Sequence, residues 1–412
     1  MSGIQDRLAA LSPEQRALLE RRLKQQGIAA PDTASGAKPG RGQAAAEAAF
    51  VPKRRRSEAT MDFSLFFFSG DGSTMDRHKY GLLMECAAFA DRHGFKAVWT
   101  PERHFEEFGG LYPNPSVLSA ALAAVTERVE LRAGSVVLPL HHPVRFVEEW
   151  SVVDNLSDGR VSVAFATGWH PADFILAPVQ DPDYYVRRKE ELFKSVEQVR
   201  ALWNGEAVPF TDASGAVHRI KTLPRPIQSE LNLWIATNGN EETYRQAAEI
   251  GAGILTGILG NGFAELEGKI ERYREALLRH GYDPQAKKVA VMLHTCLGEN
   301  DEAVRAKVER PLKEYLKTFL SQQRQILADY DGMTDADFEA IVSRAFDKYY
   351  RESSLLGTPD KCVKLVETLR DIGVGEIACL IDFGVDRETV MESLVWLSEL
   401  QRKFAYDKEL IP

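Results

Sequence analysis

The chain has 412 residues, a formal net charge of −9 at pH 7, 44% hydrophobic residues and 27% charged residues. This is the composition of an ordinary globular protein, so it excludes wholesale disorder and a fibrous repeat, and the acidic balance argues against general nucleic-acid binding. The sequence contains no run of 18 apolar residues and begins with a charged amphipathic stretch, so we expect no membrane span and no secretory signal.

The cysteines are scattered along the chain and form no CxxC pair. No histidine stands at metal-ligand spacing from any of them (Cys86, Cys296, Cys362 and Cys379). This pattern predicts a reduced, cytoplasmic setting and no metal site.

The first 60 residues differ from the rest of the chain. Residues 1–27 are predicted to form a short helical segment, with Ser12 as its N-cap and Pro13 at the first helical position. Residues 28–60 read as a flexible linker, in which the basic run Lys53–Arg56 is interpreted as a solvated stretch rather than a nucleic-acid patch. One large domain, residues 61–412, is expected to follow.

From Met61 onward, short apolar runs alternate with amphipathic segments. The predicted strands are 63–68, 97–99, 129–138, 161–166, 233–236, 254–256, 289–295 and 376–381. The predicted helices are 76–94, 116–126, 144–156, 241–250, 263–280, 360–372 and 387–404, with a long polar helical insertion near 300–350. Eight strand–helix units predict a parallel sheet closed into a (β/α)₈ barrel, an α/β fold. A doubly wound open sheet is the alternative, and the lack of a GxGxxG fingerprint after the first strand disfavours it.

In a barrel of this kind, function lies at the carboxyl ends of the strands. After the second strand, Glu102, Arg103 and His104 place an acid, a guanidinium and an imidazole side by side, and His104 can exchange a proton near neutral pH. In the third strand, Gly134 and Ser135 mark either a close ligand approach or a tight packing spot. The pair of histidines that follows this strand is interpreted as a loop turn before Pro143.

The fourth and fifth strands also end in informative loops. Trp169 and His170 are expected either to form the wall of an aromatic-ligand pocket or to cap the core. The loop Asn238–Asn240, with Thr243 in the helix that follows, can bind a phosphate through backbone N–H groups and the helix dipole. An ordinary N-cap by Asn240 is the other interpretation of this loop.

Taken in order, the motifs between residues 95 and 174 carry a stronger signal than each alone. They read WTPERHF from Trp99, FGGLYPNP from Phe108, GSVVLPLHHPVR from Gly134, EEWSVVDNLSDGR from Glu148 and GWHPADF from Gly168. This series closely resembles bacterial luciferase and its relatives, the flavin-dependent luciferase-like monooxygenases, over about residues 61–405. The variants ERHF and ATGWHPADF look like a subgroup associated with nonribosomal peptide and polyketide synthases, and LSPEQRALLERRLKQQG near the N-terminus is similar to segments that link synthetase domains.

The resemblance implies a (β/α)₈ barrel that holds reduced FMN at the strand ends, where the flavin activates O₂. Gly134 and Ser135 match the pair against the flavin ring, which is often joined by a cis peptide bond in the family. Thr167 stands where luciferase has a phosphate-binding arginine, so Arg187 or Arg188 is expected to supply that charge. The cofactor-binding residues implied in this way are Gly134, Ser135, Thr167, Gly168, Trp169, Arg187, Arg188, Asn238, Gly239, Asn240 and Thr243.

Arg103 replaces the first of two adjacent histidines that the family commonly has after the second strand. An arginine cannot exchange a proton at neutral pH, so the resemblance implies that His104 or His170 does so, or that Arg103 stabilises a peroxide anion. Because water destroys the oxygenating species, a closable site is expected, and the candidate lids are the segments 106–114, 169–182 and 300–350.

The function implied is a two-component monooxygenase that hydroxylates, or inserts oxygen in Baeyer–Villiger fashion into, an acyl or aminoacyl intermediate tethered to a carrier protein. Its expected partners are O₂, a separate flavin reductase, synthetase modules and a second copy of the chain. A deazaflavin-dependent oxidoreductase and a flavin-free docking module of an assembly line are the alternatives.

Overall fold

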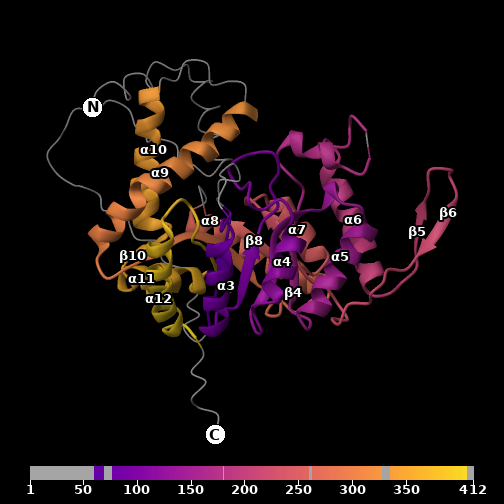
Figure 1. The fold of residues 1–412 in the computed structure, drawn as a ribbon, viewed down its shortest axis with the longest axis horizontal. Coiled ribbons are helices and arrows are strands. Elements are labelled where there is room, and N and C mark those ends of the chain that lie inside the picture. The colour runs from indigo at the N-terminus through magenta and orange to yellow at the C-terminus, as the bar shows by residue number, and fades with distance from the viewer. Residues whose placement is uncertain (1–59, 69–76, 180, 259–261, 327–334, 406–412) are drawn as a thin grey trace, which may run out of the picture.

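The computed structural model describes residues 60–68, 77–179, 181–258, 262–326 and 335–405 (Figure 1). The predicted N-terminal helix and nearly all of the predicted linker therefore lie outside the described residues. Within these ranges no helix is both long enough and apolar enough to cross a membrane.

Eight parallel strands close into a barrel. In chain order they are β1 (Asp62–Phe66), β2 (Ala97–Thr100), β3 (Glu130–Val137), β4 (Val161–Ala166), β7 (Asn232–Thr237), β8 (Gly253–Gly257), β9 (Val289–Leu297) and β11 (Glu376–Leu380). Each strand pairs with the next, and β11 returns to pair with β1, so the sheet has no open edge. The predicted (β/α)₈ barrel is confirmed, and the open-sheet alternative is wrong.

Helices surround the barrel (Figure 1). They are α3 (Gly81–Arg92), α4 (Pro115–Ala123), α5 (Pro143–Leu156), α6 (Arg188–Trp203), α7 (Glu241–Glu249), α8 (Phe263–Arg279), α9 (Asp301–Ile326), α10 (Asp335–Glu352), α11 (Pro359–Asp371) and α12 (Arg387–Arg402). Two short 3-10 helices cover Leu138–Leu140 and Pro171–Leu176. The first predicted helix begins at Gly81 rather than near residue 76, and the described residues immediately before it form a turn.

Three short strands were not predicted. Strands β5 (Val208–Thr211) and β6 (Val217–Ile220) form an antiparallel hairpin that projects from the barrel (Figure 1). Most of its residues are exposed and each strand has only four residues, so the apolar signal from which a strand is recognised is weak. Strand β10 (Leu355–Gly357) pairs with the part of β9 that continues beyond the barrel.

The amino end of the barrel interior is filled by an ion pair between aromatic rings. The Nη1 of Arg132 donates to both carboxylate oxygens of Glu376 at 2.9 and 2.8 Å. The Arg132 guanidinium also lies 4.7 Å from the ring of Trp99 and 4.9 Å from that of Trp234. Both partners of the pair are almost fully buried. This layer closes one end of the barrel, which leaves the carboxyl end for a site.

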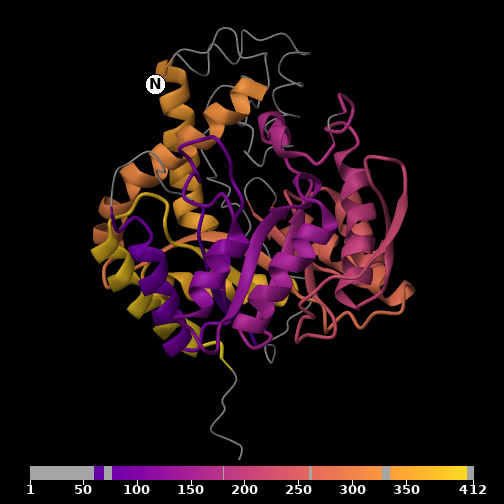
Figure 2. The same cartoon turned by 45° about the vertical axis from the view of Figure 1, so that its right-hand side comes forward.

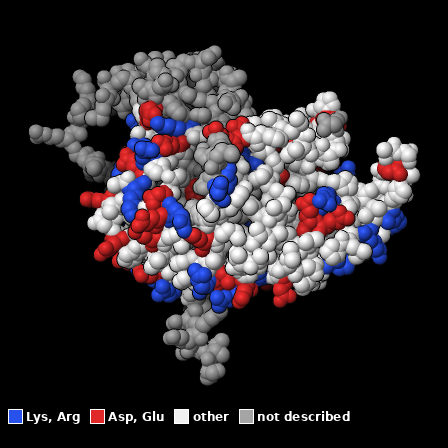
Figure 3. All heavy atoms as spheres, viewed as in Figure 1, with Lys and Arg blue, Asp and Glu red and all other residues white. Residues whose placement is uncertain are grey.

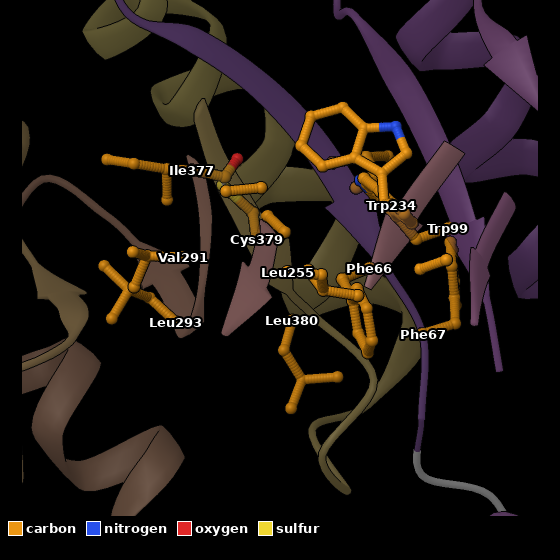
Figure 4. Packing of buried hydrophobic residues seen from close by; sticks show 14 of the residues in the cluster. Phe66, Phe67, Trp99, Trp234, Leu255, Val291, Leu293, Ile377, Cys379 and Leu380 are labelled. Atoms are coloured by element: carbon orange, nitrogen blue, oxygen red, sulfur yellow. The ribbon is translucent and has the colours of Figure 1, made fainter. Parts of the chain in front are cut away.

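Figure 4 shows how side chains of the barrel wall alternate. Phe66, Leu255 and Leu380 lie close together, while Val291 and Leu293 stand apart from them on the outer side of the wall. This alternation follows from the two-residue period of a strand. The register places Phe66 beside Leu380 and Leu380 beside His294, so these three residues share the inner face near the carboxyl end.

The long insertion consists of the two helices α9 and α10, which stand above one end of the barrel in two views (Figures 1 and 2). This end is the carboxyl end of the strands, because Tyr315 of α9 and Tyr349 of α10 both contact His294 of β9. The insertion therefore covers part of the rim where function is expected.

Candidate functional site

At the carboxyl end of the barrel, several residues on or beside the inner face are only half-buried. They are Ser135, Ala166, Ala236, Gly257 and Met292, from five different strands. A Cβ added at Gly257 would meet no atom within 4 Å. Since deeper positions of the same strands are fully buried, this group is the least covered part of the inner face among the described residues.

Gly134 and Ser135 are joined by a cis peptide bond, as the resemblance implied. The pairing of β3 with β4 shifts at this point, so that Gly134 faces Ala164 and Val136 faces Phe165. Ser135 is therefore the extra residue of a bulge, which frees it from the regular ladder. Of the two interpretations of Gly134, tight packing holds on its inner side. A Cβ there would lie 2.8 Å from Phe66 and 2.9 Å from Trp99.

The two glycines differ in a way that stability measurements can check. We expect Gly134→Ala to lower the free energy of unfolding by about 1–3 kcal/mol, because the added methyl group overpacks against Phe66 and Trp99. Gly257→Ala should leave stability nearly unchanged, because its new methyl group meets open space. Urea unfolding of both variants measures the difference, and equal destabilisation by the two would contradict the packing argument.

A buried carboxylate stands between two imidazoles beside the bulge. Oε1 of Glu102 lies 2.9 Å from Nε2 of His104 and 2.7 Å from Nε2 of His141. Oε2 of Glu102 accepts a hydrogen bond from the backbone N–H of Val137 at 2.7 Å. The Glu102 side chain is 1% exposed, whereas those of His104 and His141 are 11% and 26% exposed. The three side chains form one hydrogen-bonded group at the rim, which we call the Glu102 cluster.

The charges in the Glu102 cluster support one another. Burial acts to raise the pKa of Glu102, but the charge of His141 and the hydrogen bonds from both histidines and Val137 outweigh it, so the pKa is lowered overall. Burial acts to lower the pKa of His141, but the Glu102 charge and hydrogen bond raise it overall. Because an ionised Glu102 can only accept hydrogen bonds, both histidines carry a proton on Nε2. The atom of His104 left to exchange a proton is therefore Nδ1.

Arg103 points to a different partner from its neighbours. Its Nη1 donates to both carboxylate oxygens of Asp173, at 3.1 and 3.0 Å, and its guanidinium lies 5.0 Å from the ring of Trp169. Nδ1 of His170 lies 3.6 Å from Asp173. Burial raises the pKa of Asp173 more than the nearby cations lower it. Arg103 is 2% exposed, yet its Nε and Nη2 have no hydrogen-bond partner among the described residues. Nδ1 of His170 likewise makes no hydrogen bond within the described residues.

The three predicted lid segments meet over this part of the rim. Gly109 lies against the side chain of Arg103, and the Arg103 N–H donates to the carbonyl of Tyr112. Phe108 contacts the ring of Tyr315 on α9 edge-on, with centroids 4.8 Å apart. Glu106 lies 3.8 Å from His170. Segment 106–114 therefore contacts the insertion on one side and the loop after β4 on the other.

The two candidate arginines for a phosphate differ in their partners. Arg187 pairs with the carboxylate of Asp181 at 2.6 Å. Arg188 instead donates to the carbonyl oxygens of Gly168 and Tyr185 and lies over the ring of Tyr185. Within the described part of the chain, no carboxylate pairs with Arg188, so its charge is available to an anion.

The loop after β7 begins at the exposed Asn238 and turns at Gly239, whose φ is +92°. Oδ1 of Asn240 then accepts the backbone N–H of Thr243 at 3.1 Å, which is the ordinary N-cap of α7. Glu242, in the first turn, has a pKa lowered mainly by Arg245, with a smaller contribution from Lys189 of α6. The side chains of Lys189 and Glu242, in the first turns of α6 and α7, are therefore near enough for their charges to interact.

The loop after β4 brings the remaining predicted residues to the same rim. Thr167 and Trp169 are half-buried, and Gly168 has a φ of +76°. A Cβ on Gly168 would lie 2.7 Å from Val137 and 3.0 Å from Phe174, so the position requires glycine. The hydroxyl of Tyr185 donates to the carbonyl of Trp169, which ties this loop to the segment before α6.

The sequence motifs identified most of the residues at this rim, but not which of them form hydrogen bonds and ion pairs with one another. His141 was interpreted only as part of a turn, and neither Glu102 nor Asp173 was singled out as a partner for the neighbouring cations. Each contact joins loops that follow different strands, 39 residues apart for Glu102 and His141 and 70 for Arg103 and Asp173. The available signal was the barrel itself, because its closure brings the charged residues that follow β2, β3 and β4 to one rim.

Comparison with known proteins agrees with the geometry. Residues 61–376 match the family model described as luciferase-like monooxygenase. The oxygenase component of a flavin-dependent trigonelline monooxygenase from Acinetobacter baylyi is 24% identical over 84% of this chain and 97% of that protein. An alkanal monooxygenase alpha chain from Photorhabdus luminescens is 25% identical over 76% of this chain and 88% of its own length. The crystal structure of a monooxygenase from Streptomyces bottropensis superposes with a TM-score of 0.67 at 25% identity, covering 84% of this chain and all of the other.

Proposed function

Because this chain belongs to the luciferase-like monooxygenase family, a family of flavin-dependent oxidoreductases, we propose that it is the FMN-dependent oxygenase component of a two-component system. A separate reductase supplies the reduced flavin, and O₂ is the second substrate. The observation that carries this proposal is the half-buried group at the barrel mouth, bounded by the Ser135 bulge, together with Arg188, which has no carboxylate partner among the described residues and contacts the loop after β4.

The residues present fit a flavin mononucleotide. Ser135 and Gly257 leave room for the flat ring, because Ser135 stands outside the regular ladder and Gly257 borders open space. Arg188 would hold the phosphate, together with the loop Asn238–Asn240 and Thr243. When bound, the reduced flavin supplies the electrons that activate O₂.

The protein's own residues then handle charge and water. His104 exchanges a proton through Nδ1, because its Nε2–H already donates a hydrogen bond to Glu102. Arg103 offers Nε and Nη2 to a developing anion, and His170 stands beside it. The contact between Phe108 and Tyr315 keeps water away from this region.

Flavin binding can be tested with the two neighbouring arginines. We expect Arg188→Met to weaken FMN binding about ten- to hundredfold, since a charge-assisted hydrogen bond contributes that much to affinity. Arg187→Met should have a much smaller effect, because Asp181 already pairs with Arg187. Fluorescence titration of FMN measures both affinities. Tighter binding of a deazaflavin than of FMN would favour the hydride-transfer alternative, and no micromolar binding of either would favour a flavin-free docking module.

The finer substrate assignment rests on the motifs alone. We propose that an acyl or aminoacyl group on a carrier protein is hydroxylated or receives an inserted oxygen atom, because the ERHF and ATGWHPADF motifs resemble those of assembly-line relatives. Intact-mass analysis of loaded carrier proteins, incubated with the enzyme, FMN, a flavin reductase and labelled O₂, tests this assignment. A gain of one labelled oxygen atom supports it, and its absence across the carrier-bound candidates counts against it.

The homodimer remains a prediction. Its support is an uncharged region in the middle of the surface shown in Figure 3, which includes α4; the neighbouring α5 carries the exposed ion pairs of Arg145 with Glu148 and Glu149. Helix α4 contains no charged residue, and the large side chains of Val117 and Leu156 are about 60% exposed on this pair of helices.

A further inference from the structure

His294 occupies the uppermost inner position of β9. It is the last residue of β9 that pairs within the barrel, opposite Leu380, and it lies one inner position above the half-buried Met292. The inner face at the carboxyl end of a barrel strand is where ligand-binding residues stand. The sequence motifs did not single out His294, and no residue of the Glu102 cluster contacts it.

His294 is fully buried among aromatic rings. The rings of Tyr315, Tyr349 and Phe383 lie edge-on to the imidazole, with centroids 4.6, 5.3 and 5.3 Å away. Burial lowers the pKa of His294 to about 3, so the ring is neutral at neutral pH. A neutral imidazole presents one donor and one acceptor, because only one of its two nitrogens carries a proton.

The contacts of Tyr349 determine which nitrogen of His294 carries the proton. Its hydroxyl oxygen accepts the backbone N–H of His294 at 3.2 Å and lies 2.9 Å from Nδ1 of the same residue. The Tyr349 hydroxyl proton has Nδ1 as its only acceptor among the described residues, so Nδ1 accepts and Nε2 carries the ring proton. A buried hydroxyl proton left without an acceptor would be costly, which excludes the opposite arrangement.

The Nε2–H of His294 is then a buried donor without a partner in the described part of the chain. Phenylalanine would fill a purely structural position in this aromatic group without that desolvation cost. We propose that the Nε2–H of His294 donates a hydrogen bond to a carbonyl oxygen of the substrate, and that the surrounding rings receive an apolar or aromatic part of the same molecule. This assignment rests on the proposed function and adds the chemical class of its substrate.

A ligand can reach the Nε2–H of His294 only if side chains of the α9–α10 insertion move. Because His294 is fully covered, the carbonyl reaches Nε2 when a covering ring shifts, and Tyr315 is the ring that connects His294 to the lid segments. It contacts His294 on one side and Phe108 of segment 106–114 on the other. The donor is therefore exposed to the mouth only by a rearrangement of the same segments that cover Arg103.

The test compares two probes of similar shape on the full-length chain. Acetophenone carries a carbonyl beside an aromatic ring, and ethylbenzene lacks the carbonyl. We expect ¹⁵N-detected NMR to find the proton of His294 on Nε2, and its resonance to shift with acetophenone and not with ethylbenzene. In His294→Phe, we expect the dissociation constant of acetophenone to rise about five- to tenfold, the size of one hydrogen bond, with that of ethylbenzene unchanged.

Tyr349→Phe serves as the second variant. It removes the hydroxyl that fixes the tautomer, and we expect part of the loss seen in His294→Phe. A ring proton on Nδ1 in the unsubstituted protein, equal responses to the two probes, or equal weakening of both by His294→Phe would overturn the proposal. FMN titration of the same samples separates this result from the proposed function, because failure to bind flavin leaves the response of His294 to acetophenone measurable.

Discussion

Replacing Glu102 by glutamine is expected to lower the free energy of unfolding by about 2–4 kcal/mol near pH 5.5, because it removes a buried charge that two imidazoles and a backbone N–H share. The amide also brings its own N–H groups against donors, since Nε2 of both histidines and the N–H of Val137 all point at this side chain. Urea unfolding of the variant across a range of pH measures the loss.

The pH dependence of this loss follows from the two pKa shifts. Glu102 has a lowered pKa, so its contribution is present above the unfolded value of about 4.3 and is lost as the pH falls through the folded value. His141 has a raised pKa, so its contribution is present below the unfolded value of about 6.5 and is lost as the pH rises through the folded value. The difference between the two proteins should therefore be largest between about pH 4.3 and 6.5.

A matched control is available on the surface. Glu85 pairs with Arg387 outside the core, and an exposed ion pair contributes little to stability, so Glu85→Gln should change the unfolding curve only slightly. If Glu102→Gln destabilised the protein equally at pH 5.5 and at pH 9, the coupling of Glu102 to a charged His141 would be wrong. The remaining loss at high pH measures the neutral hydrogen bonds alone.

The barrel was predictable because each strand carries its own signal. A barrel strand is buried by helices on one face and by the barrel interior on the other. Its sequence is therefore an almost continuous apolar run, as in residues 63–68. The β5–β6 hairpin was not predictable on the same basis, since it projects from the barrel with most of its side chains exposed. Closure of the barrel was predicted from the number of strand–helix units, because no single unit indicates whether a sheet is open or closed.

The site was predictable only as a set of positions. The predicted residues lie toward the carboxyl end of the barrel, because they follow a strand or, for Gly134 and Ser135, belong to the second half of β3. Their partners depend on the order of strands around the barrel and on side-chain direction, which the local sequence does not contain. Arg103 and His104 are adjacent in the chain, yet they pair with Asp173 and Glu102, in separate clusters.

Arg103 is the residue whose removal should affect the proposed chemistry most. We expect Arg103→Met to speed the release of H₂O₂ from the complex with reduced FMN about a hundredfold, because a buried donor aimed at developing negative charge is lost. Stopped-flow mixing of that complex with oxygenated buffer, with H₂O₂ assayed in parallel, measures this rate without any organic substrate.

Two further variants separate charge from proton exchange. Arg103→Lys keeps the charge but not the planar set of donors, and it should recover only part of the effect. Arg103→His introduces the residue that relatives commonly have, which can both donate and exchange a proton, and it should recover more. Arg128→Met, at the opposite end of the barrel with its exposed side chain near Asp91, should release H₂O₂ at the unsubstituted rate.

Arg103→Met should also remain folded, because of how Asp173 responds to the loss of its partner. Without Arg103, Asp173 keeps its burial and loses the cation that lowers its pKa most, so the pKa of Asp173 should rise further. A higher pKa lessens the cost of leaving this buried carboxyl group without Arg103, so Arg103→Met should fold even though it fails to retain peroxide. If the variant folded, bound FMN normally and released H₂O₂ at the unsubstituted rate, Arg103 would be a structural partner of Asp173 alone, and stabilisation of the anion would fall to His104 or His170.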